Sequence, residues 1–199
     1  MGQNQKIIVM ASGTGSILEA LIAAELPIVA VVTDRKCPAE DIARDGNIRC
    51  IRVTRDSFGE TFDRKSYTNK LLNAILEINP DLIAMAGFGT VLSDDLEKRF
   101  PNRVLNTHPS LLPLFKGWHA VRDALVADVE VTGCSIHIVT AELDAGPILY
   151  QQEVPIMPGD SEESLHKRIK EVEKIIYPKV IRQFLDSDFN LQPMNIELH

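Results

Sequence analysis

Short, nearly continuous apolar runs alternate with segments of helical periodicity through the first half of the chain. The apolar runs are as long as β-strands, and they occupy 5–11, 27–34, 50–54, 82–86 and 103–107. Helices are predicted between them at 17–24, 39–45, 63–78 and 94–100. Strands that are apolar on both faces and separated by helices form a parallel sheet that helices cover on both faces. The pattern therefore predicts an α/β fold with an open, mostly parallel, Rossmann-like sheet.

The pattern changes after residue 130. Two predicted strands, 131–139 and 148–154, are joined by a loop and indicate an antiparallel C-terminal extension of the sheet. A long helix follows, with Asp160 as the expected N-cap and Glu163 completing a capping box. An apolar stripe should pack this helix on the sheet, and it consists of Leu165, Ile169, Val172, Ile175 and Ile176. We expect a single domain over 1–187 and a flexible tail over 188–199.

Charge and composition exclude several classes of protein. Of the 199 residues, 45% are apolar and 25% charged, which is typical of a globular chain. The formal net charge of −7 argues against a nucleic-acid partner. No apolar run approaches the roughly 20 residues of a membrane span, and none resembles a secretory signal. The three cysteines, Cys37, Cys50 and Cys134, are too far apart to indicate a disulfide framework or a zinc site. We expect a cytoplasmic protein with no metal, no membrane partner and no nucleic acid.

The first apolar run ends in the turn Ser12-Gly13-Thr14-Gly15-Ser16, directly before a predicted helix. Such a turn offers backbone N–H groups and the positive end of a helix dipole to a phosphate. The dinucleotide fingerprint would need a third glycine at position 18, where the chain has Leu18. Asp34 stands about where a ribose-binding acid is expected, so dinucleotide binding stays open at this point. A tight turn without any ligand is also open.

Asn106 and His108 lie two residues apart at the end of a predicted strand, so their side chains should project from the same face. An amide donor beside an imidazole suits acyl transfer, in which the amide stabilises an oxyanion and the imidazole moves a proton. Asp144, in a loop of small residues, could orient the imidazole and stabilise its cation. The alternatives are a histidine satisfied by local hydrogen bonds and an aspartate that caps a turn.

Four other polar residues are weaker candidates. His119 begins a predicted helix and is expected to be solvated, while His137 lies on a strand and is interpreted as a polar core residue. Lys170 and Glu173 are three residues apart on the long helix and share a face. Their simplest interpretation is a solvated ion pair, and the alternative is a pair of substrate ligands.

Three segments together carry a family resemblance. They are Ser12-Gly13-Thr14-Gly15-Ser16, Leu105-Asn106-Thr107-His108-Pro109-Ser110-Leu111-Leu112-Pro113 and Glu142-Leu143-Asp144-Ala145-Gly146-Pro147. The chain resembles the phosphoribosylglycinamide formyltransferases, the folate-dependent enzymes of purine synthesis, over residues 7 to about 184. The second and third segments mark the wider formyltransferase superfamily, and the first points to the purine enzymes within it.

The resemblance implies transfer of a formyl group from 10-formyltetrahydrofolate to the amine of glycinamide ribonucleotide, with no metal. It implies that Asn106, His108 and Asp144 are catalytic. The implied ribonucleotide contacts are Gly13, Thr14, Gly15, Ser16, Ile17, Lys170 and Glu173. The implied folate contacts are Arg64, Gly89, Thr90, Val91, Leu92, Asn106, Val139 and Thr140. The partners would be these two small molecules, and a homodimer is left open.

Three residues depart from the common pattern of the family. Ile17 stands where an asparagine that helps hold the ribonucleotide is usual, and an aliphatic side chain cannot replace its hydrogen bonds. Thr90 replaces a frequent arginine, and Gly89 replaces a frequent methionine beside the folate site. We expect these changes to alter affinity and to leave the reaction unchanged.

Three other functions compete with this one. A methionyl-tRNA formyltransferase would carry a further C-terminal domain and a basic surface, and this chain has neither the length nor the charge. A formyltetrahydrofolate hydrolase shares Asn106, His108 and Asp144 but usually carries an N-terminal regulatory domain, whereas the first strand here begins near residue 7. A non-catalytic nucleotide-binding module would use the 12–16 turn and would not need His108.

Overall fold

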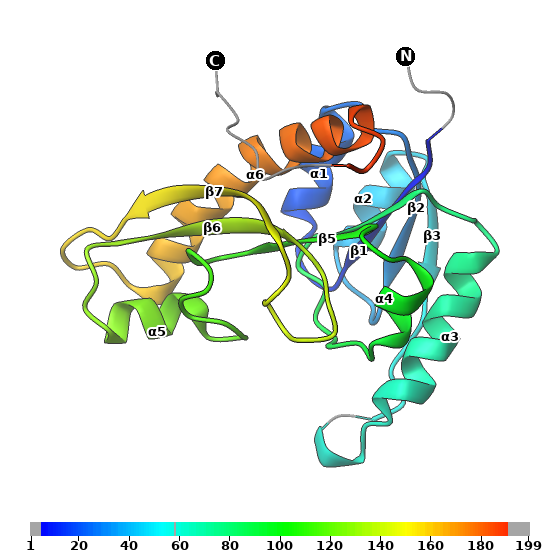
Figure 1. Ribbon diagram of the computed structural model, residues 1–199, viewed down its shortest axis with the longest axis horizontal. Helices are drawn as coiled ribbons and strands as arrows, with labels where there is room; N and C mark the ends of the chain where they lie inside the picture. The colour runs from blue at the N-terminus through cyan, green and yellow to red at the C-terminus, as the bar shows by residue number, and fades with distance from the viewer. Residues whose placement is uncertain (1–4, 58, 191–199) are drawn as a thin grey trace. The chain divides into compact units, whose positions relative to one another are not determined.

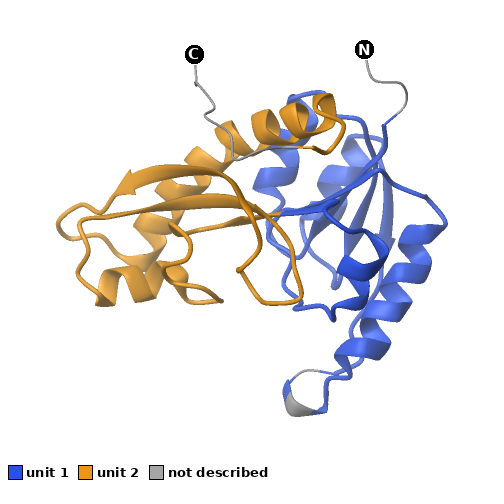
Figure 2. Cartoon of the chain, viewed as in Figure 1, with its two compact units in different colours: residues 1–105 blue, residues 106–199 orange. Residues whose placement is uncertain are grey.

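The computed structural model describes residues 5–57 and 59–190, and the chain divides into two compact units. Unit 1 ends at Leu105 and unit 2 begins at Asn106 (Figure 2). The predicted single domain over 1–187 stays a prediction. In the described part of the chain, no helix is both long and apolar enough to cross a lipid bilayer.

Unit 1 is built on four parallel strands (Figure 1). They are β1 (Ile7–Ala11), β2 (Ile28–Thr33), β3 (Arg49–Arg52) and β4 (Leu82–Met85). β1 pairs with β2 on one side and with β4 on the other, and β3 pairs with β2. Every residue of β1 is 0% exposed, as expected for a central strand that is covered on both faces.

The helices of unit 1 form two pairs. They are α1 (Ser16–Ala23), α2 (Ala39–Asp45), α3 (Arg64–Leu76) and α4 (Asp95–Arg99), with a 3-10 turn at Gly59–Thr61. The chain runs from β1 outward to β3 and then returns to β4 on the other side of β1. Because βαβ crossovers are right-handed, this reversal places α1 and α2 on one face and α3 and α4 on the other. The packing of α1 against α2, and of α3 against α4, agrees with this placement.

Strand β5 (Val104–His108) carries the chain into unit 2, which contains α5 (Ala120–Val126), β6 (Val131–Ile138), β7 (Ile148–Pro155) and α6 (Glu162–Asp186). β6 and β7 are antiparallel, and α6 packs on both of them. Among the described residues, the strand order is β3-β2-β1-β4-β5-β6-β7. The predicted fold class, a mostly parallel open sheet with an antiparallel C-terminal extension, is confirmed.

Helix α6 differs from its sequence prediction at two places. Its N-cap is Ser161 instead of Asp160, and the capping box is closed by Ser164 instead of Glu163. Ile175 is 58% exposed, so its predicted place in the buried stripe is wrong. One row of buried positions along α6 is spaced by four or three residues, as a helix of 3.6 residues per turn requires, and it consists of Leu165, Ile169, Glu173, Ile176, Val180 and Phe184. Tyr177, Pro178, Ile181 and Leu185 widen the buried face toward the C-terminal end. The polar residue Glu173 therefore occupies a place in the buried stripe.

The first residues of the expected tail are held against α6. The backbone N–H of Phe189 donates to the carbonyl oxygen of Phe184 at 3.0 Å, and the two rings meet edge to face with centroids 5.6 Å apart. Residues 191–199 of the predicted tail lie outside the described residues.

Candidate active site

The end of β5 presents polar side chains on both of its faces. Asn106 and His108 share one face because successive side chains of a strand alternate. Thr107 points to the other face, where its hydroxyl donates to the Glu173 carboxylate on α6 at 2.8 Å. His108 and Thr107 are buried, and Asn106 is partly buried.

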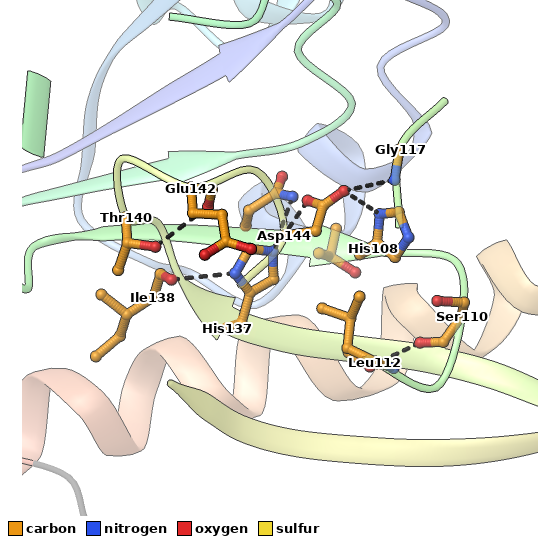
Figure 3. Close-up of polar contacts among 12 residues, drawn as sticks. His108, Ser110, Leu112, Gly117, His137, Ile138, Thr140, Glu142 and Asp144 are labelled. Carbon is orange, nitrogen blue, oxygen red and sulfur yellow. Dashed lines mark hydrogen bonds and ion pairs between the residues drawn. The ribbon is translucent and has the colours of Figure 1, made fainter. Parts of the chain in front are cut away.

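Both ring nitrogens of His108 have partners within unit 2. Nε2 lies 2.8 Å from the carbonyl oxygen of Phe115, and Nδ1 lies 3.4 Å from Oδ2 of Asp144 (Figure 3). A carbonyl oxygen only accepts hydrogen bonds, so in the neutral ring the proton belongs on Nε2. Nδ1 is then the nitrogen that gains and loses a proton, and it does so facing a carboxylate.

Asp144 is held between two histidines and a backbone amide. Its Oδ2 accepts a hydrogen bond from the N–H of Gly117 at 2.9 Å, and its Oδ1 lies 3.6 Å from Nε2 of His137. In Figure 3, one oxygen of the Asp144 carboxylate contacts both the Gly117 N–H and the His108 ring. Asp144 has a φ of 50°, a left-handed conformation that aspartate tolerates better than most residues. The loop therefore delivers a buried carboxylate to the imidazole of His108.

His137 joins Asn106 to the same cluster. Its Nδ1 donates to the carbonyl oxygen of Ile138 at 3.1 Å, so its Nε2 is the acceptor in the neutral ring. Nε2 lies 3.2 Å from the amide nitrogen of Asn106. One amide hydrogen of Asn106 is thus directed at His137, and the second is left for another acceptor.

Burial and charge act in opposite directions on the two ionisable partners. Burial lowers the pKa of His108, and the carboxylate of Asp144 and the Phe115 carbonyl only partly oppose it. For Asp144, burial raises the pKa, but the neighbouring His137 and His108 and the Gly117 N–H outweigh it, so the pKa is lowered overall. The resting site therefore pairs an ionised Asp144 with a histidine that favours its neutral form.

A network of hydroxyl and amide groups fixes the loop that carries Phe115 and Gly117. Ser135 donates to the carbonyl oxygen of Ser110 at 2.6 Å and accepts from the N–H of Leu112 at 2.9 Å. Gln151 donates to the carbonyl oxygen of Leu112 at 2.8 Å. β6 and β7 therefore hold this loop where its carbonyl can contact His108.

The Asp144 loop depends on a close approach at Gly146. A Cβ atom there would lie 1.8 Å from the carbonyl oxygen of Ile138, which no side chain can tolerate. The Ile138 N–H in turn donates to the carbonyl oxygen of Pro147 at 2.9 Å. Glycine at this position allows the loop to close against the end of β6.

In unit 1, the 12–16 turn leads into α1 as its sequence predicts. Gly15 is the N-cap, with a φ of 80°, and a Cβ atom there would lie 2.5 Å from Cδ1 of Ile42. Gly13 is exposed, and a Cβ atom there would have nothing within 4 Å. Ile17 is 6% exposed and belongs to the core. The turn therefore leaves open space at Gly13, just before α1, while the Ile17 side chain is buried in the core.

Comparison with known proteins decides the family. Residues 5–181 match the model of the formyl transferase family. A phosphoribosylglycinamide formyltransferase from Mycobacterium tuberculosis is 42% identical over 174 residues, covering 85% of this chain and 80% of the relative. The one from Escherichia coli is 38% identical over 188 residues, covering 90% of this chain and 87% of the relative.

This chain belongs to the formyl transferase family. Among solved structures, glycinamide ribonucleotide transformylase 1 from Symbiobacterium toebii superposes with a TM-score of 0.86 at 34% identity, covering 94% of this chain and 90% of the other. The family resemblance seen in the sequence is confirmed, and the chain is a formyltransferase.

The dinucleotide alternative does not fit this formyltransferase. Asp34, its expected ribose ligand, is 1% exposed, and both carboxylate oxygens are used inside unit 1. Arg35 donates to each of them at 2.9 Å, and the hydroxyl of Thr90 donates to Oδ2 at 2.6 Å. The Asp34 carboxylate is therefore not available to a ribose.

The solvated ion pair expected for Lys170 and Glu173 is also wrong. Glu173 is 5% exposed and accepts a hydrogen bond from Thr107, and burial raises its pKa to about 7. Lys170 is partly buried, and its charge opposes this rise. The hydrogen-bonding partner of Glu173 is thus a β5 hydroxyl, which sequence spacing along α6 could not indicate.

The remaining folate candidates have varied surroundings. Arg64 is exposed at the first residue of α3, and Thr90 is 4% exposed with its hydroxyl bound to Asp34. Gly89 lies so close to Arg35 that a Cβ atom would be 2.8 Å from its Nη2. The partly buried candidates are Val91, Leu92, Val139 and Thr140. Within the described residues, no group of three acidic, histidine or cysteine side chains is arranged to hold a metal ion.

Three groups that contact His108, Asn106 or Asp144 lie outside the catalytic set that the sequence predicts: the His137 ring, the Phe115 carbonyl and the Gly117 N–H. His137 was interpreted as a core residue, and it is indeed 2% exposed, but its ring bonds Asn106 and faces Asp144. Ser135 and His137 lie two residues apart on one strand and share a face, and this spacing is the signal that could have placed His137 in the site. The Phe115 carbonyl and the Gly117 N–H are backbone groups, for which side-chain identity gives no signal.

Proposed function

We propose that this formyltransferase transfers a formyl group from 10-formyltetrahydrofolate to the amine of N1-(5-phosphoribosyl)glycinamide, in purine biosynthesis. The relatives' names support the acceptor, and membership of the family supports a folate-derived donor. The observation that carries the chemistry is the contact between Nδ1 of His108 and the carboxylate of Asp144, 3.4 Å apart. The partners are these two small molecules; no metal, nucleic acid or membrane takes part.

The reaction begins with attack of the substrate amine on the formyl carbon. The carbonyl double bond opens, and negative charge develops on its oxygen. The second amide hydrogen of Asn106 stabilises this oxyanion, since the first is directed at His137. His137 is therefore a positioning group for the Asn106 amide.

The proton released by the attacking amine passes to Nδ1 of His108, which is neutral in the resting site. The cation so formed is stabilised by Asp144 on one side and by the Phe115 carbonyl on the other. His108 then returns the proton to the folate nitrogen as its bond to the formyl carbon breaks. The tetrahedral intermediate collapses to the formylated amide and tetrahydrofolate.

The proposed substrate contacts are those that the family resemblance implies. The phosphate of the ribonucleotide binds backbone N–H groups over Gly13 to Ile17, with Ile17 contributing only its backbone because its side chain is buried. Lys170 and Glu173 contribute to ribonucleotide binding. The folate donor binds Arg64, Asn106 and the segments 89–92 and 139–140.

An assay of tetrahydrofolate formation with and without the ribonucleotide tests this function. We expect product only when the ribonucleotide is present, and we expect Asp144→Asn to lower kcat by roughly a hundredfold or more, because the histidine loses the charge that stabilises its cation. Asp123→Asn, which removes an exposed carboxylate on α5, is the matched control and should retain activity. Equal product without ribonucleotide would indicate a hydrolase. No turnover, either with or without the ribonucleotide, would favour a nucleotide-binding module.

A further inference from the structure

A buried carboxylate in unit 1 links the loops that follow three parallel strands. Asp34 directly follows β2 and is 1% exposed. It accepts a hydrogen bond from Thr90, which lies in the loop after β4, and the hydroxyl of Ser12, which follows β1, helps to lower its pKa. A charged side chain is buried in this way only when an opposite charge pairs with it and its oxygen atoms accept hydrogen bonds.

The compensation of Asp34 is nearly complete. Nε and Nη2 of Arg35 donate to its two oxygens at 2.9 Å each, in a two-pronged contact. The Thr90 hydroxyl donates to Oδ2 at 2.6 Å, and Nε of Arg55 lies 3.6 Å from the same oxygen. Burial raises the pKa of Asp34, but the bonds from Arg35, Thr90 and Ser12 outweigh it and lower the pKa overall. The carboxylate is therefore ionised and firmly held.

The loops after β1 and β4 also contact each other at this point. The N–H of Gly89 donates to Oγ of Ser12 at 2.5 Å, and the N–H of Ser12 donates to the carbonyl oxygen of Gly87 at 3.1 Å. A side chain at Gly89 would collide with the Arg35 guanidinium, because a Cβ atom would lie 2.8 Å from Nη2. Gly89 and Thr90, two of the residues that depart from the family pattern, are thus the ones that accommodate Arg35 and bind Asp34.

We propose that Asp34 is a positioning residue for both substrates, because its carboxylate fixes the 12–16 loop and the 89–92 loop relative to each other. This inference rests on the proposed function, in which the first loop binds the ribonucleotide phosphate and the second binds the folate donor. Asp34 itself touches neither substrate. It acts on the 89–92 loop through Thr90, and that loop in turn holds Ser12 through the Gly89 N–H.

Steady-state kinetics of a small set of variants tests the role. Asp34→Asn keeps the size of the side chain but removes its charge, and we expect KM to rise roughly tenfold for both substrates, the factor that corresponds to losing one charge-assisted hydrogen bond. kcat should change much less, because the His108 cluster is intact. Thr90→Val removes only the link to the second loop, so KM should rise for the folate alone, and Thr90→Ser should restore it.

Glu40→Gln is the matched control. Glu40 is also a unit 1 carboxylate that binds a threonine hydroxyl, from Thr33 at 2.8 Å, and an arginine, Arg52, so the hydrogen bonds of its side chain go to β2 and β3. It should leave both KM values at the parent level even where it lowers the melting temperature. Unchanged KM values in Asp34→Asn, or equal increases in Glu40→Gln, would overturn the inference.

Hydrogen exchange of the substrate-free protein separates this inference from the proposed function. We expect the amides of residues 12–16 and 87–92 to exchange faster in Asp34→Asn than in the parent, and to be unaffected in Glu40→Gln. If the parent protein transfers no formyl group, the proposed function fails, and exchange still decides whether Asp34 couples the two loops. Unaltered exchange in both segments of Asp34→Asn would refute the coupling.

Discussion

Replacement of Glu173 by glutamine tests whether the buried carboxyl on α6 titrates near neutral pH. The carboxyl is 5% exposed, accepts a hydrogen bond from Thr107, and has its pKa raised by burial from 4.5 to about 7. Glutamine has the same shape and can still accept from the Thr107 hydroxyl. The substitution therefore removes the ionisation and leaves the packing of α6 unchanged.

The sign and size of the effect follow from proton linkage. Between pH 4.5 and about 7 the unfolded chain has lost the proton that the folded chain retains, so the free energy of unfolding falls as the pH rises through this window. Above the pKa of Glu173 in the folded protein, the free energy of unfolding no longer falls with pH. At about 1.4 kcal/mol per pH unit, the total decrease amounts to about 3 kcal/mol. Glu173→Gln has no such loss. Its stability relative to the parent should therefore increase by about 2.5 kcal/mol between pH 5 and pH 8.

Urea unfolding followed by circular dichroism at the two pH values measures this difference. Glu171→Gln removes the same charge from the exposed side of α6, where Glu171 pairs with Lys174, and it is the matched control. Its difference from the parent should stay within about 1 kcal/mol at both pH values, as for other surface ion pairs. A Glu173→Gln difference that stays constant with pH, or that decreases as the pH rises, would refute the raised pKa.

Three further predictions concern the active site and the phosphate loop. Gly146→Ala should destabilise the protein by about 2 kcal/mol or more in thermal unfolding, because its Cβ would lie 1.8 Å from the Ile138 carbonyl oxygen, and an unchanged melting temperature would contradict this close approach. The acid limb of kcat/KM should fall below pH 6.5, since burial lowers the pKa of His108 and activity is lost as the pH falls through it. An acid limb above pH 6.5 would contradict the lowered pKa, and full activity at low pH would contradict the neutral ring as the proton acceptor. Gly13→Ala should raise KM for the ribonucleotide without changing the melting temperature, whereas Gly15→Ala should lower the melting temperature, because only the second Cβ collides with the protein.

Much of the fold could be predicted because it rests on local patterns. A strand that is apolar at every position, such as β1, has no alternative to burial on both faces, and its residues are all 0% exposed. The turn after it could be placed because Gly15 adopts a positive φ that few other residues tolerate. The α6 boundary was harder, since Asp160, Ser161 and Ser164 are all good capping residues and only the hydrogen bonds distinguish them.

The candidate site could be predicted only in part. The two-residue spacing of Asn106 and His108 places them on one face, but the approach of Asp144 depends on a loop that closes through Gly146. The burial of Glu173 has no local signal, because a glutamate beside a lysine on a helix is usually solvated, and its partner Thr107 is 66 residues away in the chain. The local spacing of residues does not predict contacts between segments that are far apart in the sequence.

Transfer of an isotopically labelled formyl group tests the central claim most directly. The parent protein would be incubated with labelled 10-formyltetrahydrofolate and the phosphoribosyl glycinamide, and the label would be located by mass spectrometry. We predict that it appears on the glycinamide amine, and that it stays on the folate when His108 is replaced by alanine. Label released as formate at the same rate with and without the ribonucleotide, or transfer that is unaffected by loss of His108, would contradict the account.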